Sequence, residues 1–195
     1  VEIINRDKIE LLGATTVADI TRNLTASSGA ENNADSFTSG STQGTSNVNL
    51  RGLGLSSTLV LVDGRRNTVS GQFANDGSVF VDTNMIPVVA LERVEVLKEG
   101  AASVYGSDAV AGVVNYILRR DFTGVEVNVS QQKGDLGDQT DDRVSAMWGG
   151  EVNGANLVVA YSELNRSPIA GTELTDYSQL AISTLGNSFL VLPGG

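Results

Sequence analysis

The sequence predicts an α+β domain over residues 1–120, followed by antiparallel β-strands over residues 121–195. Two observations predict this division. Before Asp121, some segments repeat apolar residues at helical spacing and others form apolar runs of strand length. After Asp121, apolar and polar residues alternate with a period of two, which is typical of half-buried strands. A chain of 195 residues is long enough to bury a core of its own.

The N-terminal segment predicts one strand and two helices. Residues 1–4 form a short apolar strand, and Asn5 suits the N-cap of a helix that stops at Gly13, where a free φ is useful. Thr16 and Asp19 have the spacing of a capping box that starts a second helix. Three apolar residues then share one helical face, as expected for packing on a sheet: Val17, Ile20 and Leu24.

Two polar loops follow. Residues 27–47 are rich in Ser, Thr, Gly and Asn, with Phe37 as an isolated aromatic, and such a segment cannot bury enough apolar surface to order itself. Residues 65–78 form the second loop, with Phe73 as its one large apolar side chain before Val79. Long loops inside a compact domain are usually functional or disordered. Between them two strands are expected, at residues 48–51 and 58–63.

The rest of the α+β part predicts a turn, a short helix and two strands. Asp63-Gly64 can turn tightly after the preceding strand. Pro87 suits the first turn of a short helix through Leu91, because its missing N–H needs no partner there. The remaining strands are expected at residues 93–97 and 113–118.

Residues after Asp121 contain three alternating segments, at residues 125–130, 144–148 and 157–164. This alternation suits strands between lipid and the lumen of a barrel, and it suits an ordinary half-buried antiparallel sheet equally well. Asn153-Gly154 predicts a tight turn between the second and third strands.

Composition excludes several classes of function. The chain has no cysteine and no histidine, so disulfides, Cys/His zinc sites and His-based nucleophile systems are excluded. A formal charge of −10 without a basic cluster argues against nucleic-acid binding. The chain begins at Val1 without the features of a signal peptide, so we expect any such peptide upstream or already removed.

The carboxylates do not predict a catalytic or metal site. Two acids suffice for glycoside hydrolysis, but nothing in the spacing selects a pair among Asp63, Glu92, Glu95, Asp108 and Asp121. Six arginines lie in the same segments and favour structural ion pairs instead: Arg51, Arg65, Arg66, Arg93, Arg119 and Arg120. A second acidic group lacks the spacing of a calcium loop and is interpreted as a solvated turn: Asp135, Asp138, Asp141 and Asp142. Gly52-Leu53-Gly54 is not a dinucleotide loop, because serine replaces the third glycine and a strand follows.

Three stretches resemble the plug domain of TonB-dependent outer-membrane transporters. The first is VNLRGLG at residues 48–54, which runs into LVLVDGRR at residues 59–66. The second is IP at residues 86–87 with LERVEVL at residues 91–97, and the third is GAASVYGSDAVAGVVN at residues 100–115. Their order and spacing match the family's pattern, and the resemblance extends over residues 1–120.

The resemblance implies a plug inside a 22-stranded outer-membrane β-barrel, of which residues 121–195 supply about three strands. The barrel is therefore incomplete in this chain, and its remaining strands are expected in the same or another chain. The turn at Asn153-Gly154 would be periplasmic, whereas residues 133–142 and the tail after Asn165 would be extracellular loops. The two polar loops would face an extracellular ligand. Candidate ligand contacts in them are Phe37, Arg66, Asn67, Gln72, Phe73 and Asn75.

The resemblance also implies partners. Arg51 and Arg93 correspond to plug arginines that pair with glutamates on the barrel wall. The TonB-ExbB-ExbD complex would act through a TonB box upstream of Val1, outside this chain. The ligand would be a siderophore, cobalamin or a glycan, its choice depending largely on barrel loops, and outer-membrane lipids would surround the barrel. No catalytic residue, metal or cofactor is implied. The alternative is a stand-alone plug-like binding or assembly module without its own barrel, and a carboxylate-dependent hydrolase is a more distant one.

Overall fold

The computed structural model describes residues 1–27, 44–74, 76–98, 101–133, 140–167, 181–182 and 188–189. By its internal contacts the chain divides into two compact units. One consists of Val1–Glu126 with Ala146–Tyr161, and the other of Val127–Ser145 with Ser162–Gly195. The expected domain boundary at residue 120 stays a prediction.

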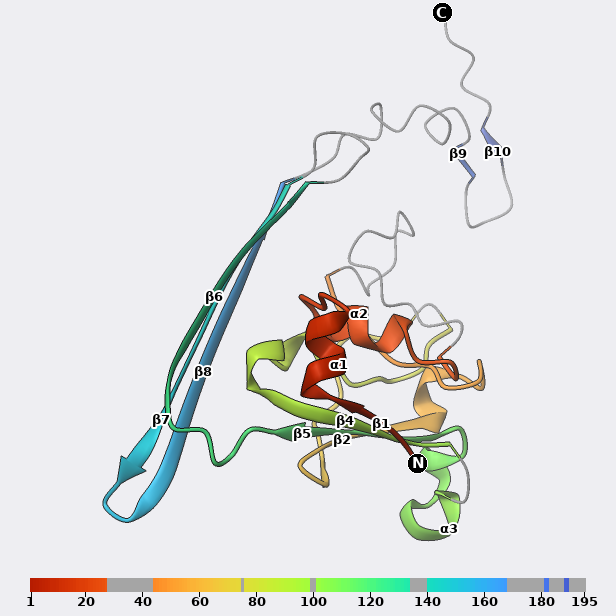
Figure 1. The fold of residues 1–195 in the computed structure, drawn as a ribbon. Coiled ribbons are helices and arrows are strands. Elements are labelled where there is room, and N and C mark those ends of the chain that lie inside the picture. The colour runs from red at the N-terminus through yellow and green to blue at the C-terminus, as the bar shows by residue number, and fades with distance from the viewer. Residues whose placement is uncertain are drawn as a thin grey trace, which may run out of the picture. The chain divides into compact units, whose positions relative to one another are not determined.

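A five-stranded sheet with the order β1-β4-β5-β2-β3 organises the first part of the chain (Figure 1). Its strands are β1 (Glu2–Asn5), β2 (Thr58–Val62), β3 (Arg65–Arg66), β4 (Leu91–Leu97) and β5 (Gly112–Leu118). β2 and β5 are parallel, whereas the other neighbouring pairs are antiparallel. The expected small mixed sheet with short helices is therefore confirmed.

Helices α1 (Arg6–Leu11) and α2 (Val17–Arg22) lie over one face of this sheet (Figure 1). Each begins at the expected cap. The carboxamide oxygen of Asn5 accepts a hydrogen bond from the N–H of Lys8. Thr16 and Asp19 form a complete capping box at the start of α2. Both helices are short, and α2 depends on burial of its apolar face for stability.

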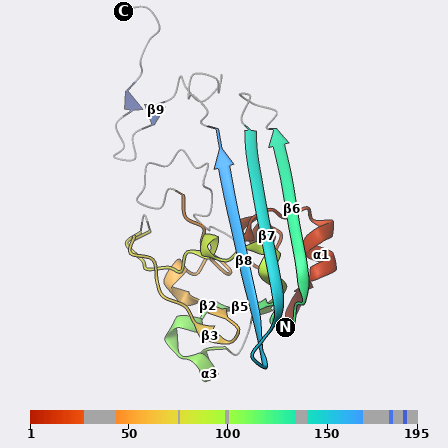
Figure 2. The ribbon, with the colours of Figure 1, turned by 90° about the vertical axis from the view of Figure 1, so that its left-hand side faces the viewer.

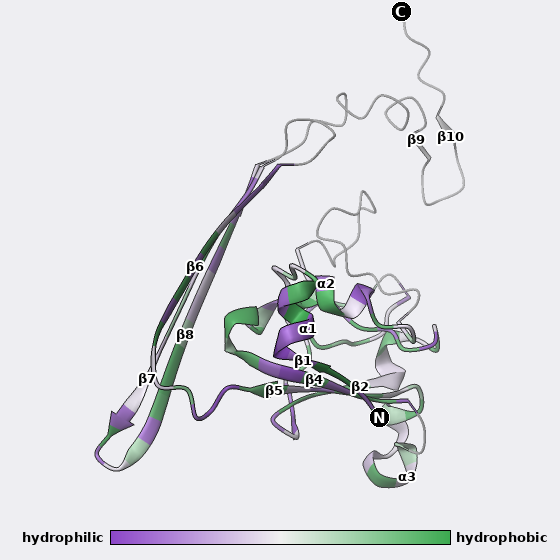
Figure 3. Cartoon of the chain, in the orientation of Figure 1, coloured by the Kyte–Doolittle hydropathy of each residue, from purple (hydrophilic) through white to green (hydrophobic). Residues whose placement is uncertain are grey.

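The main core fills the space between these helices and the sheet. It contains the three apolar residues that the helical periodicity selected, together with one residue of α1 and several of β4 and β5: Val17, Ile20, Leu24, Ile9, Leu91, Val94, Val96, Val114 and Tyr116. A smaller cluster on the opposite face joins Leu59, Leu61 and Val113 to the segment of α3 (Ala102–Tyr105) and η4 (Ser107–Ala109). In Figure 3, β4 carries hydrophilic as well as hydrophobic colouring, because Glu92, Arg93 and Glu95 alternate with its buried residues.

Two expected elements differ in the structure. Residues 48–51 were expected to form a strand, but only Leu50 makes an isolated bridge, to Ser27, and Arg51 turns away with φ of 60°. The prediction was wrong because the side chain of Asn49 accepts the N–H of Gly54 and bends the chain locally. The expected helix after Pro87 is a single 3-10 turn, η3 (Val88–Ala90), and β4 begins directly after it. Two further 3-10 turns are η1 (Leu55–Ser57) and η2 (Thr83–Met85).

Three long strands form a separate antiparallel sheet with the order β6-β7-β8 (Figure 2). They are β6 (Gly124–Lys133), β7 (Thr140–Val152) and β8 (Ala155–Arg166). Asn153 and Gly154, with φ of 53° and 79°, make the expected tight turn between β7 and β8. The expected loop at residues 133–142 is shorter than predicted, since β7 already begins at Thr140, and residues 134–139 lie outside the described part.

Two short strands, β9 (Ala181–Ile182) and β10 (Ser188–Phe189), pair with one another in the tail beyond Asn165. Within the described part of the chain, every helix is too short or too polar to cross a membrane.

Candidate functional site

The second polar loop, between β3 and η2, is closed by backbone hydrogen bonds and by apolar contacts at its ends. The N–H of Ser70 donates to the carbonyl of Phe80 at 2.7 Å, and that of Ala74 donates to the carbonyl of Ser78 at 2.9 Å. Ala74 and Phe80 are buried against Leu55, which lies just before β2. The loop therefore stands at the N-terminal end of β2 and is closed by hydrogen bonds and apolar contacts.

Three of the candidate ligand residues lie on this loop. Asn67 is half-buried and accepts the N–H of the next residue with its carboxamide oxygen at 2.8 Å. Gln72 is exposed, and the ring of Phe73 is 59% exposed. Phe37 and Asn75 lie outside the described residues. Their contact with a ligand stays a prediction.

Arg66, the only charged residue among the six candidates, makes its contacts with α3 and η4. Its Nη1 donates to the carboxylate of Asp108 at 2.5 Å, and its Nη2 donates to the carbonyl of Tyr105 at 2.8 Å. This guanidinium therefore ties β3 to α3 and η4. The structure gives Arg66 different surroundings from Gln72 and Phe73, and contact of Arg66 with a ligand stays a prediction.

Arg93 lies in a chain of polar contacts across the sheet. Its Nε donates to Glu95 at 2.8 Å, and the other carboxylate oxygen of Glu95 accepts from Asn115 at 3.3 Å. Asn115 in turn accepts the N–H of Gly64 at 2.9 Å, at the turn after β2. The turn itself is as expected, with Asp63 and Gly64 at φ of 51° and 75°. Pairing of Arg93 with a glutamate of a barrel wall stays a prediction.

Arg51 lies in a turn that hydrogen bonds hold to neighbouring segments. Its N–H donates to the carbonyl of Ala26 at 2.6 Å, and the preceding N–H, of Leu50, donates to the hydroxyl of Thr58 at 3.0 Å. The side chain is exposed, and among the described residues its guanidinium makes neither an ion pair nor a hydrogen bond. Arg51 is thus available to a carboxylate outside this part of the chain.

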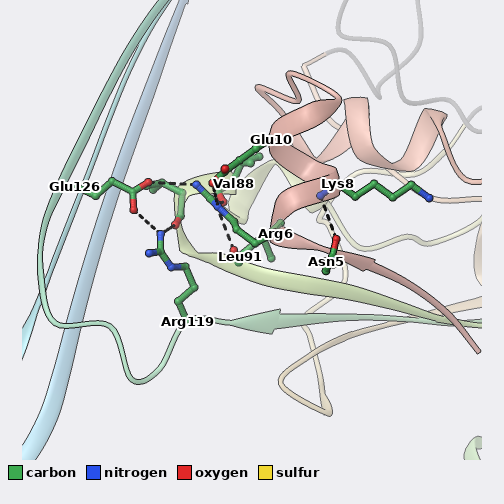
Figure 4. A network of polar contacts seen from close by, with 9 residues as sticks. Asn5, Arg6, Lys8, Glu10, Val88, Leu91, Arg119 and Glu126 are labelled. Atoms are coloured by element: carbon green, nitrogen blue, oxygen red, sulfur yellow. Dashed lines mark hydrogen bonds and ion pairs between the residues drawn. The ribbon is translucent and has the colours of Figure 1, made fainter.

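A network that the sequence analysis missed is centred on Glu126, near the start of β6 (Figure 4). One carboxylate oxygen accepts from Arg119 at 2.6 Å and the other from Arg6 at 3.2 Å. The same guanidiniums bind η3 and the first residue of β4: Arg6 donates to the carbonyls of Val88 and Leu91, and Arg119 donates to that of Val89. No local pattern links these residues, because Arg6 and Glu126 are 120 positions apart.

The carboxylates are distributed among separate ion pairs, as expected for structural roles. Arginine residues pair with four of them: Arg66 with Asp108, Arg93 with Glu95, Arg119 with Glu126, and Arg120 with Asp63. Asp141, from the acidic group interpreted as a solvated turn, is instead bound by Arg166 on the neighbouring strand. Across the described ranges, no three acidic residues are grouped so that they could hold a metal ion.

Comparison with known proteins agrees with this architecture. The TonB-dependent Receptor Plug Domain family matches residues 1–113. Three solved structures are similar to the plug together with the following strands. A variant of the ferric enterobactin receptor PfeA from Pseudomonas aeruginosa, in complex with enterobactin, is 23% identical with a TM-score of 0.67 over 92% of this chain. The ferric citrate transporter FecA in its unliganded form is 25% identical with a TM-score of 0.65 over 85%.

The third structure is the siderophore receptor PirA from Acinetobacter baumannii, which is 26% identical with a TM-score of 0.60 over 84% of this chain. This chain spans about a quarter of the length of these receptors, namely 26%, 25% and 24% of PfeA, FecA and PirA. The family match covers more than half of the chain. The chain therefore belongs to the TonB-dependent receptor plug domain family, a component of bacterial outer-membrane receptors and not an enzyme.

Proposed function

We propose that this chain is the plug, with the leading barrel strands, of a TonB-dependent transporter that binds a scarce extracellular nutrient and gates its energised uptake into the periplasm. The observation that supports the proposal is the length of chain over which the structural similarity extends. The likeness to a receptor of known structure does not stop at the plug but runs through the strands after it, over 92% of this chain. A plug followed directly by barrel strands is the arrangement that such uptake needs.

The proposal includes the location and the partners. The plug would lie in the lumen of a barrel in the outer membrane, with the remaining strands supplied by the same or another chain and with lipid around them. Energy would come from TonB-ExbB-ExbD through an upstream TonB box that pairs by strand addition. Open strand edges facing lipid cost several kcal/mol for each unsatisfied backbone group, which is why β6–β8 need further strands.

The two plug arginines give a direct test. In the lumen, Arg51 and Arg93 would pair with wall glutamates, and such pairs hold a plug yet separate under load. We expect the double substitution Arg51→Ala/Arg93→Ala in the full receptor to increase passage of small hydrophilic solutes and protease cleavage of the plug. Arg65→Ala combined with Glu95→Gln is the matched control, because Arg65 is exposed and makes no ion pair among the described residues, and Glu95→Gln removes the internal ion pair of Arg93. If the double variant is indistinguishable from this control, the anchoring role is wrong.

The stand-alone module is distinguished by the mass of the native polypeptide. Antibodies against residues 1–120 should detect, in the outer-membrane fraction, a polypeptide several times heavier than the 20.4 kDa of this sequence. TonB-dependent accumulation of a nutrient in cells that carry this polypeptide, and its loss without TonB, would then support transport. A native species near 20.4 kDa would favour the separate module instead.

A further inference from the structure

The connection between the plug sheet and the following strands is short. β5 ends at Leu118 and β6 begins at Gly124, so only residues 119–123 join them, and we call this segment the exit linker. A link of this length spans at most about 20 Å when fully extended. The exit linker, η3 and the parts of β7 and β8 described below all belong to the same compact unit. On this side the plug therefore cannot move far from the strands that follow it.

Polar contacts hold the exit linker on both sides. The guanidinium of Arg119 donates to the carboxylate of Glu126 at 2.6 Å (Figure 4), and the N–H of Arg119 donates to the carbonyl of Ala90 in η3 at 2.9 Å. At the next residue, the carbonyl of Arg120 accepts a hydrogen bond from the carboxamide of Asn156, near the start of β8, at 2.7 Å. The exit linker is thus bound to the plug through η3 and to the long strands through β8.

Apolar contacts join the same segments. Val89 and Ala90 of η3 form a buried cluster with Met147 of β7, which is 1% exposed. Partly buried residues of β5, the exit linker and β8 pack against this cluster: Leu118, Phe122, Val158 and Ala160. The end of the plug and one face of β7 and β8 therefore share a small core from which water is excluded.

Gly149 leaves room for the backbone of the exit linker. It lies two residues after Met147, on the same face of β7. A Cβ at Gly149 would overlap the carbonyl oxygen of Phe122 and lie 2.8 Å from its carbonyl carbon. The adjacent Gly150 faces the other way, and the nearest atoms to a Cβ there belong to the side chain of Trp148, at 3.1 Å. Neither glycine has a positive φ, so position 149 requires glycine for space alone.

From these contacts we infer that one face of β7 and β8 is a seat for the exit linker, and that the plug stays attached there when it opens. The seat consists of Met147, Gly149, Asn156, Val158 and Ala160. It needs neither Arg51 nor Arg93, so the opening for a ligand lies along another side of the plug. The inference rests on the proposed function in one respect, since it takes β7 and β8 as part of the barrel wall.

Trypsin tests the seat on the purified full-length receptor, because Arg119 and Arg120 place two cleavage sites in the exit linker. A protease cuts a native protein only where a segment is released from its contacts, and the rate follows the population of the released state. We expect Gly149→Ala to speed cleavage at these sites about tenfold or more, because the added methyl displaces the backbone of Phe122. Gly150→Ala is the matched control and should stay within about twofold of wild type.

Asn156→Ala is the second variant, which removes one hydrogen bond at an exposed position and leaves the core of the seat intact. It should speed cleavage at the same sites about fivefold, the effect of a typical hydrogen bond. If Gly149→Ala gives no folded receptor, Asn156→Ala decides. Cleavage at wild-type rate in Asn156→Ala, or equal rates in Gly149→Ala and Gly150→Ala, overturns the seat.

The double variant Arg51→Ala/Arg93→Ala tests whether the seat is independent of the plug arginines. Its exit linker should be cleaved at the wild-type rate, even where cleavage elsewhere in the plug increases. Faster cleavage at Arg119 and Arg120 in this variant would show that the seat opens together with the rest of the plug, which overturns the inference. Proteolysis requires no transport, so these outcomes are separate from the proposed function, which fails instead if the native polypeptide is near 20.4 kDa.

Discussion

Replacement of Glu126 by glutamine should loosen the N-terminal strand and helix. The carboxylate of Glu126 lies between Arg119 and Arg6, so glutamine keeps the shape of the side chain but removes the charge that both guanidiniums share (Figure 4). Arg6 is the first residue of α1 and directly follows β1. The effect should therefore be local to β1, α1 and the beginning of β6.

The magnitude follows from burial. The three side chains are 23% (Arg6), 18% (Arg119) and 25% (Glu126) exposed, so the network lies between a surface pair and a buried one. Surface pairs contribute about 0–1 kcal/mol, and loss of one partner of a buried pair costs about 3–5 kcal/mol. We expect about 2 kcal/mol, which raises the population of the locally open state about thirtyfold.

Hydrogen exchange followed by mass spectrometry on the full-length receptor measures this opening. Peptides from residues 1–12 and 119–126 should exchange faster in Glu126→Gln, and a peptide from the centre of β5 should not. Asp108→Asn is the control, because its pair with Arg66 is more than half exposed on both sides and should contribute less than about 1 kcal/mol.

A double-mutant cycle sharpens the expectation. Coupling between Glu126 and Arg119, at 2.6 Å, should exceed that between Glu126 and Arg6, at 3.2 Å, because Arg6 also pairs with Glu10 at 2.7 Å. The reasoning is refuted if Glu126→Gln leaves exchange in both peptides unchanged. It is equally refuted if exchange rises uniformly along the plug, since that result reports global destabilisation.

Three further predictions concern the plug core. Gly112→Ala should destabilise the plug by about 2–4 kcal/mol, because φ is 138° and an added Cβ would lie 2.5 Å from the carbonyl oxygen of Leu97. Gly13→Ala is the control and should cost less, because a Cβ at Gly13 meets open space. Equal shifts of the two variants in thermal unfolding would contradict the prediction. Tyr116→Phe should raise the unfolding free energy by about 1 kcal/mol, because the buried hydroxyl has no hydrogen-bond partner among the described residues; a loss of stability would show that the hydroxyl is satisfied. Burial raises the pKa of Asp19, but hydrogen bonds from the capping-box N–H and hydroxyl groups lower it further than burial raises it. The stabilisation from this carboxylate is therefore complete above its unfolded pKa of about 3.9 and is lost as pH falls through the lower folded value; acid titration of α2 unfolding should lose that pH dependence in Asp19→Asn, and an unchanged profile would refute it.

Local hydrogen bonds explain which elements could be predicted. Asn5 caps α1, and the Thr16 box caps α2, through contacts no more than four residues long. The Asp63-Gly64 turn likewise needs only its own backbone conformation. In contrast, the strand expected at residues 48–51 does not form, since the contacts that bend this segment come from outside it, including the hydroxyl of Thr58.

The candidate site likewise has features that the sequence predicts and features that only the tertiary structure shows. Sequence by itself determined the family, because the motifs of the plug are short and contiguous. Only the tertiary structure determined which charged side chains pair with one another. Arg66 meets Asp108 42 positions away, and Arg6 meets Glu126 120 positions away. Ion pairing depends on distance in space and on exclusion of water, and neither is encoded in residue spacing along the chain.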